Sequence, residues 1–189
     1  MLYNLDMKLT EKTIKEKLVF EGKIISVQHD TVQLGVTNQT AFRELITHPG
    51  AVCVGAMTQD KKFVMVKQFR YGPKAVFLEF VAGKKEENED PLTTVQRELE
   101  EETGYQAKTW IDLGYAYSSP ALFDEKIHLY FACDLVMTKP HLDDGEFLEV
   151  VEMTLDDIIE LIETNQLHDM KTIAMAYRIK HYLNNQHKK

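Results

Sequence analysis

Runs of apolar residues along the chain predict a protein that mixes helices and strands. Between residues 16 and 47, short β-like runs alternate around the polar break at 36–39, which is typical of an antiparallel β ribbon. His48-Pro49-Gly50 then marks a boundary. Because a small ribbon is marginal alone, we expect it to pack on the main domain or on a second subunit.

After this boundary the pattern changes to apolar-rich stretches, which predict strands of a sheet covered on both faces. The predicted strands are AVCVGAM from Ala51, KKFVMVKQFRY from Lys61, AVFLEFVAG from Ala75, and two further runs around Thr109–Tyr117 and Ile127–Leu135. We therefore divide the chain into an N-terminal ribbon, residues 1–48, and a main domain, residues 49–189.

Three helices are predicted from their end signals. The first runs from Pro91 to about Thr103, with Asp90 as N-cap and Gly104 as the C-terminal stop. The second begins at the capping pattern Thr154-Leu-Asp-Asp157, and the third spans roughly Lys171–Tyr182. The expected fold class is α/β (α+β).

Composition limits the size of the core, the cellular location and the kinds of partner. With 44% apolar residues among 189, the chain can bury one core. It has no apolar run near the ~20 residues of a membrane helix and no hydrophobic leader, so we expect a soluble, cytoplasmic protein. The 30 acidic residues outnumber the 22 basic ones without a local basic patch, which argues against a nucleic-acid partner. Cys53 and Cys133 are interpreted as reduced core residues.

The first predicted helix carries unusual chemistry. At ~100° per residue, Glu98, Glu101 and Glu102 form one arc that borders the apolar stripe. Most such helices only present a solvated acidic face, but like charges at these spacings are destabilising, so a cation should compensate them. Carboxylate oxygens suit a hard ion such as magnesium. Arg97, one turn before Glu101, is placed to hold that carboxylate.

The segment from Gly83 to Tyr105 reads glycine, five residues, glutamate, seven residues, then Arg-Glu-Leu-Glu-Glu-Glu-Thr-Gly-Tyr. This segment resembles the Nudix box at every fixed position. Only Tyr105 is loose, because an aliphatic residue is commoner there. The resemblance implies a Nudix α/β/α sandwich with a mixed sheet, to which the N-terminal antiparallel β ribbon is added, and a magnesium-dependent hydrolase activity.

Further motifs look closest to the ADP-ribose pyrophosphatase branch of this family. They are Arg43-Glu44, Lys67-Gln-Phe-Arg-Tyr71, Glu79-Phe-Val-Ala-Gly83, Asp124-Glu125 and Gly145-Glu-Phe-Leu-Glu-Val150. The resemblance implies cleavage of ADP-ribose to AMP and ribose 5-phosphate. It also implies a homodimer in which the N-terminal ribbon is exchanged between subunits and completes the neighbour's pocket.

The resemblance also assigns roles to residues. The metal ligands for magnesium, with manganese as a substitute, would be the carbonyl of Ala82 and the carboxylates of Glu98, Glu101 and Glu102. The catalytic residues would be Glu146 as general base, with Asp144 or Glu149 as substitutes, together with Glu101 and Arg97. The substrate-binding residues would be Arg43, Arg70, Glu79 and Glu125.

Alternatives stay open within this scheme. The same machinery could act on another nucleoside-diphosphate sugar, such as GDP-mannose or a UDP-sugar. Ala121-Leu-Phe123 is bulkier and more apolar than is usual in the branch, which affects the side of the pocket that receives the terminal sugar. A Nudix-fold sensor that binds ADP-ribose without cutting it is the alternative from a different class, although a sensor usually loses box carboxylates that this chain retains.

Overall fold

The computed structural model describes residues 9–139 and 147–186. Its described residues form two compact units. One contains the chain up to Pro49 together with Ser119–Glu125, and the other contains Gly50–Ser118 and the chain from Lys126 onward. The loop at 119–125 joins the first unit through backbone hydrogen bonds, including one from the nitrogen of Ile46 to the carbonyl of Leu122 at 2.7 Å.

The first unit is built on an antiparallel sheet, as the sequence predicts. Its central strand pairs along one edge with two short strands in succession and along the other edge with one strand. The strands are β1 (Glu11–Lys15), β2 (Leu18–Glu21), β3 (Ser26–Leu34) and β4 (Thr40–Thr47). The sheet is larger than the expected ribbon because β1 begins before residue 16.

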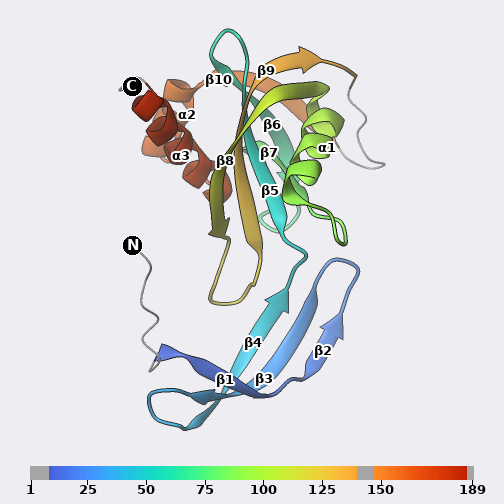
Figure 1. The fold of residues 1–189 in the computed structure, drawn as a ribbon, viewed down its shortest axis with the longest axis vertical. Coiled ribbons are helices and arrows are strands. Elements are labelled where there is room, and N and C mark those ends of the chain that lie inside the picture. Colours follow the sequence, from blue (N-terminus) through green and yellow to red (C-terminus); the bar gives the residue numbers. More distant parts are fainter. Residues whose placement is uncertain (1–8, 140–146, 187–189) are drawn as a thin grey trace. The chain divides into compact units, whose positions relative to one another are not determined.

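The second unit contains a mixed six-stranded sheet in the order β10-β6-β7-β5-β9-β8 (Figure 1). Its strands are β5 (Ala51–Met57), β6 (Lys62–Arg70), β7 (Ala75–Lys84), β8 (Tyr105–Tyr117), β9 (Lys126–Met137) and β10 (Leu148–Thr154). The pairing of β5 with β9 is parallel and the others are antiparallel. The sequence pattern does not predict β10.

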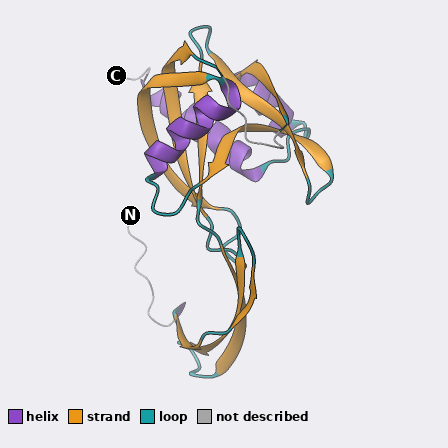
Figure 2. Ribbon diagram, turned by 90° about the vertical axis from the view of Figure 1, so that its right-hand side faces the viewer, coloured by secondary structure: helices purple, strands orange, loops and turns teal. Residues whose placement is uncertain are grey.

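Helices cover both faces of this sheet (Figures 1 and 2). Helix α1 (Pro91–Thr103) lies on one face, and α2 (Leu155–Glu163) and α3 (Met170–Gln186) lie on the other. Both predicted N-caps are present: Asp90 accepts hydrogen bonds from the start of α1, and Thr154 forms a capping box with Asp157. None of the helices in the described ranges is both long and apolar enough to span a membrane.

Strand β5 shows how the sequence specifies these layers. Val52 and Val54 belong to the core cluster that includes Leu99 of α1, whereas Cys53 belongs to the opposite cluster with Ile179 of α3. Alternation along a strand sends successive side chains to opposite faces. At Gly55 a Cβ atom would lie 2.2 Å from Ile179 Cδ1, so a larger residue here would force the Ile179 side chain to shift. The predicted α/β/α sandwich is confirmed.

Candidate active site

Helix α1 holds three carboxylates at the border of the core. Leu99 is fully buried and fixes the rotation of the helix about its axis. Glu102 is only 5% exposed, and the side chains of Glu98 and Glu101 are 15% and 33% exposed. Burial of a carboxylate is costly unless positive charge or hydrogen bonds compensate it.

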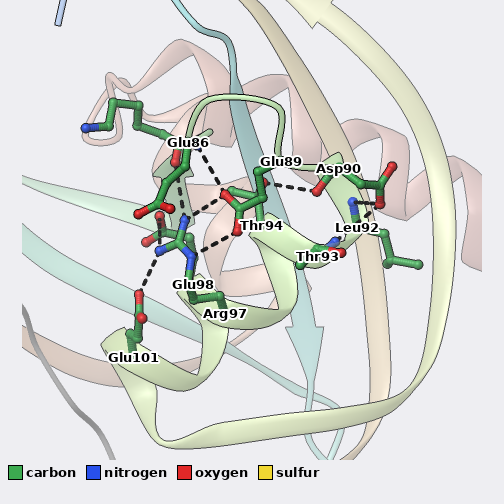
Figure 3. A network of polar contacts seen from close by, with 10 residues as sticks. Glu86, Glu89, Asp90, Leu92, Thr93, Thr94, Arg97, Glu98 and Glu101 are labelled. Atoms are coloured by element: carbon green, nitrogen blue, oxygen red, sulfur yellow. Dashed lines mark hydrogen bonds and ion pairs between the residues drawn. The ribbon is translucent and has the colours of Figure 1, made fainter.

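Arg97 supplies part of that charge (Figure 3). Its Nη1 lies 2.9 Å from Glu98 Oε1 and 2.8 Å from Glu101 Oε2. Its Nε and Nη2 donate to the two oxygens of Glu89, each at 3.1 Å. One guanidinium therefore bridges the loop before α1 and two carboxylates of the helix, and it fixes where these carboxylates point.

Glu89 is a member of this network to which the sequence analysis assigns no role, although it is the isolated glutamate of the box. Hydrogen bonds from Arg97 are the largest cause of its shift, and they lower the pKa of Glu89 from 4.5 to about 2. The same bonds raise the pKa of Arg97. The sequence signal for Glu89 was its fixed place in the motif. Glu89 and Arg97 are eight residues apart and Glu89 precedes the helix, so helical spacing does not predict their contact.

Glu89→Gln is expected to lower the free energy of unfolding by about 1–2 kcal/mol at neutral pH, since hydrogen bonds between charged groups contribute about that much. The carboxylate is more acidic in the folded than in the unfolded state, so its contribution is complete above pH 4.5 and is lost as the pH falls through about 2.

Urea denaturation of the wild type and Glu89→Gln at about pH 7 and about pH 3 measures this contribution. The difference between the two proteins should shrink at the lower pH, while the control Glu87→Gln, at an exposed position of the same loop, should differ little from wild type at either pH. If the difference in unfolding free energy between wild type and Glu89→Gln stays constant or grows at the lower pH, the ionised Glu89 carboxylate is not the source of the stabilisation.

The end of β7 lies directly against Glu98. A Cβ atom on Gly83 would lie 1.9 Å from Glu98 Cδ and 2.2 Å from Glu98 Oε1, so a larger residue at 83 would displace the Glu98 side chain from this position. Ala82, the residue before it, pairs with Cys53 of β5. The sheet thus brings the backbone next to the predicted carbonyl ligand within reach of a predicted carboxylate ligand.

These residues fit a divalent cation by their chemistry, because carboxylate and carbonyl oxygens are the ligands that hard cations prefer. Over residues 9–139 and 147–186, no three His, Cys, Asp or Glu side chains form a ready-made cation site. Arg97 engages Glu98 and Glu101 in this arrangement and reduces the repulsion between them. The ligand roles of Ala82, Glu98, Glu101 and Glu102 stay predictions.

Arg70 and Glu79 form a second charged group on the same unit. Arg70 Nε and Nη2 donate to the two oxygens of Glu79 at 2.7 and 2.6 Å. The Glu79 side chain is 1% exposed, whereas that of Arg70 is 40% exposed. Burial opposes ionisation of Glu79, but the bonds from Arg70 and the nearby charge of Lys171 outweigh it and lower the pKa of Glu79.

The remaining predicted residues are more scattered. Arg43 and Glu125 belong to the first unit, where Arg43 pairs with Glu11 and Glu125 lies 3.4 Å from His48 Nδ1. Glu146, the predicted base, lies outside the described residues, as does Asp144. Glu149 is described: its side chain is 67% exposed and pairs with Lys67 at 3.0 Å.

Comparison with known proteins adds three findings. The model of the NUDIX domain matches residues 46–174. The ADP-ribose pyrophosphatase of Bacillus subtilis (strain 168) is 42% identical over 92% of each chain, and the methanol dehydrogenase activator of Bacillus methanolicus is 43% identical over 88% of this chain and 91% of that one. A crystal structure of an ADP compounds hydrolase superposes with a TM-score of 0.83 over 94% of this chain and 97% of the other, at 20% identity, and shows the same fold.

Proposed function

Because the chain belongs to the NUDIX domain family, we propose that it is a magnesium-dependent hydrolase that cleaves ADP-ribose into AMP and ribose 5-phosphate. The observation that carries this proposal is the arrangement at α1, where the carboxylates of Glu98 and Glu101 meet Arg97, and Glu98 meets the backbone of Gly83. The 42% identical relative named ADP-ribose pyrophosphatase supports the choice of substrate.

In this reaction a water oxygen bonds to one phosphorus and the bridging P–O bond breaks, which leaves two phosphomonoesters. A bound magnesium ion, for which manganese could substitute, would neutralise the phosphate oxygens and lower the pKa of a bound water. The proposed ligands are the carbonyl of Ala82 and the carboxylates of Glu98 and Glu102, with Glu101 shared or nearby. Arg97 keeps Glu98 and Glu101 oriented, as its ion pairs indicate.

Glu146 is the proposed general base, which takes the proton from the attacking water. The support is its place in the Gly145-Glu146-Phe147 motif. Glu149, one alternative, is largely exposed and is paired with Lys67, so we prefer Glu146, which stands at the motif position of the base.

The proposed substrate contacts are Arg70, Glu79, Arg43 and Glu125. Arg70 presents a partly exposed guanidinium whose orientation is fixed by Glu79, which suits recognition of an anionic or oxygen-rich group. Arg43, on the exchanged N-terminal ribbon, would complete the pocket of the neighbouring subunit, and Glu125 is the fourth proposed contact. A site that buries such polar groups rejects a ligand that leaves them without partners.

A homodimer with exchanged N-terminal ribbons is part of the proposal. Phe20 and Phe42 are 54% and 68% exposed, and the strand register places both on one face of the first unit's sheet. Exposed apolar surface of this kind indicates a partner. Phe42→Asp should therefore yield a monomer by light scattering and a less active protein, and a fully active dimer would contradict the architecture.

The substrate choice is tested by catalytic efficiencies for ADP-ribose, GDP-mannose and a UDP-sugar, measured with magnesium as released phosphomonoester. We expect the catalytic efficiency for ADP-ribose to exceed that for compounds with another base by orders of magnitude. The wrong base would bury hydrogen-bond donors and acceptors without partners. For other ADP-sugars the catalytic efficiency should be lower than for ADP-ribose by only about 10–200-fold, because Ala121, Leu122 and Phe123 offer mainly apolar contacts.

The outcomes of this comparison separate the alternatives. A higher efficiency for GDP-mannose or a UDP-sugar would overturn the choice of ADP-ribose and leave the hydrolase assignment intact. Binding of ADP-ribose without any product would instead identify a sensor.

A further inference from the structure

Lys171 and Asp169 form a charged pair at the start of α3 that the activity proposed above does not use. Lys171 Nζ bonds to Glu79 Oε2 and lies 3.0 Å from Asp169 Oδ1. Glu79 Oε2 also accepts from Arg70 Nη2 at 2.6 Å. Two carboxylates and two cations therefore form one continuous network from α3 through β7 to β6.

The members of this network differ in exposure. The side chains of Lys171 and Asp169 are each 16% exposed and that of Glu79 is 1% exposed, whereas the side chain of Arg70 is 40% exposed. Arg70 is thus the member that solvent or a ligand reaches most easily. Glu79 contacts Arg70 directly, Lys171 contacts Glu79, and Asp169 contacts Lys171.

The start of α3 is fixed to β7 beside this network. Thr172 Oγ1 accepts from the backbone nitrogen of Phe80 at 3.0 Å and donates to Asp169 Oδ2 at 2.6 Å. Asp169 Oδ2 also accepts from the nitrogen of Thr172 at 2.9 Å. Asp169 therefore caps the helix and restrains Lys171 at the same time, which leaves Lys171 little freedom to swing away from Glu79.

We propose that Lys171, restrained by Asp169, is a positioning residue for substrate binding: it fixes the Glu79 carboxylate, which in turn fixes the guanidinium of Arg70 that contacts the substrate. This inference rests on the proposed role of Arg70. Without Lys171, Glu79 keeps Arg70 as its cationic partner, so the carboxylate and the guanidinium paired with it are held less tightly. Burial of the carboxylate makes the loss of one cation costly.

The test is a double-mutant cycle on the full chain, with kcat and KM for ADP-ribose measured with magnesium. Lys171→Met should raise KM about tenfold, the effect of losing one charged hydrogen bond, and change kcat less than about threefold. Lys171→Arg keeps a positive charge at this position, so its KM should stay within about threefold of the wild-type value. Lys180→Met, at an exposed position of the same helix, is the matched control and should leave KM unchanged.

The cycle distinguishes positioning from general stabilisation. Arg70→Ala should raise KM. In that background Lys171→Met should raise KM further by less than about twofold, because Lys171 acts on substrate binding through Arg70. A tenfold effect that persists in the Arg70→Ala background overturns the inference, as does an unchanged KM in folded Lys171→Met. If Lys171→Met does not fold, Asp169→Asn, which retains a capping side chain, should raise KM in the same direction, and an unchanged KM there also overturns it.

Failure of the proposed function gives a different result. If Arg70→Ala leaves KM unchanged, the substrate role of Arg70 is wrong and the positioning inference is wrong with it. If Arg70→Ala raises KM and neither Lys171→Met nor Asp169→Asn does, only the positioning inference is wrong.

Discussion

Glu98→Gln and Glu102→Gln are each expected to reduce turnover of ADP-ribose by at least about a hundredfold, because each would remove a proposed charged ligand of a cation, and such a cation stabilises the transition state by several kcal/mol. The substitutions preserve side-chain size, and Val95 and Leu99 still anchor α1 in the core. Circular dichroism and denaturation should therefore show a folded protein, while steady-state assays with magnesium show the loss.

Glu100→Gln provides the matched control for these variants. Glu100 lies on the same helix, but its carboxylate accepts a hydrogen bond from Gln106 Nε2 at 2.9 Å and takes no part in the contacts around Arg97. Its substitution should leave turnover within about twofold of wild type. Near-normal turnover in Glu98→Gln or Glu102→Gln would rule out that residue as a metal ligand.

Glu146→Gln is expected to lower kcat by about a hundredfold to ten-thousandfold and to change KM much less, because a general base acts in the transition state. Steady-state kinetics with ADP-ribose at saturating magnesium separates the two constants. Asp144→Asn and Glu149→Gln, assayed alongside, test the substitutes. Full turnover in Glu146→Gln together with a loss in one of the other two would move the base to that residue.

Local signals were sufficient to predict α1. Asp90, Pro91 and Gly104 mark its ends within the sequence itself, and the structure begins and ends the helix at the predicted residues. The contact between Arg97 and Glu101 is also local, since residues four apart on a helix are neighbours. Such features depend on a few adjacent residues and do not require knowledge of the rest of the chain.

Strand β10 shows where the local signals end. It is an edge strand whose sequence, LEVVEMT, carries two glutamates and shows no clear alternation of burial. Pairing with β6 over its whole length defines it as a strand, from Leu148 opposite Gln68 to Thr154 opposite Lys62. Strand β8 similarly begins at Tyr105, before the predicted start near Thr109, because Tyr105 pairs with Met137 of β9.

The charged networks were only partly predictable for the same reason. Glu79 and Lys171 are 92 residues apart in the chain, and their contact depends on the docking of α3 beside β7. No periodicity along the sequence reports that contact. The motif positions of Arg70 and Glu79 were recognisable, but the bidentate pair between them and its extension to α3 required the structure.

The central claim is that this chain uses a divalent cation at the carboxylates of α1 to cleave ADP-ribose. The most direct measurement incubates the wild-type protein with ADP-ribose and separates the products by ion-exchange chromatography, with magnesium, with excess chelator, and with magnesium restored after chelation. We predict equal amounts of AMP and ribose 5-phosphate with magnesium, no cleavage with chelator, and full recovery on restoration. No cleavage with magnesium, or cleavage that the chelator does not reduce, would contradict the account.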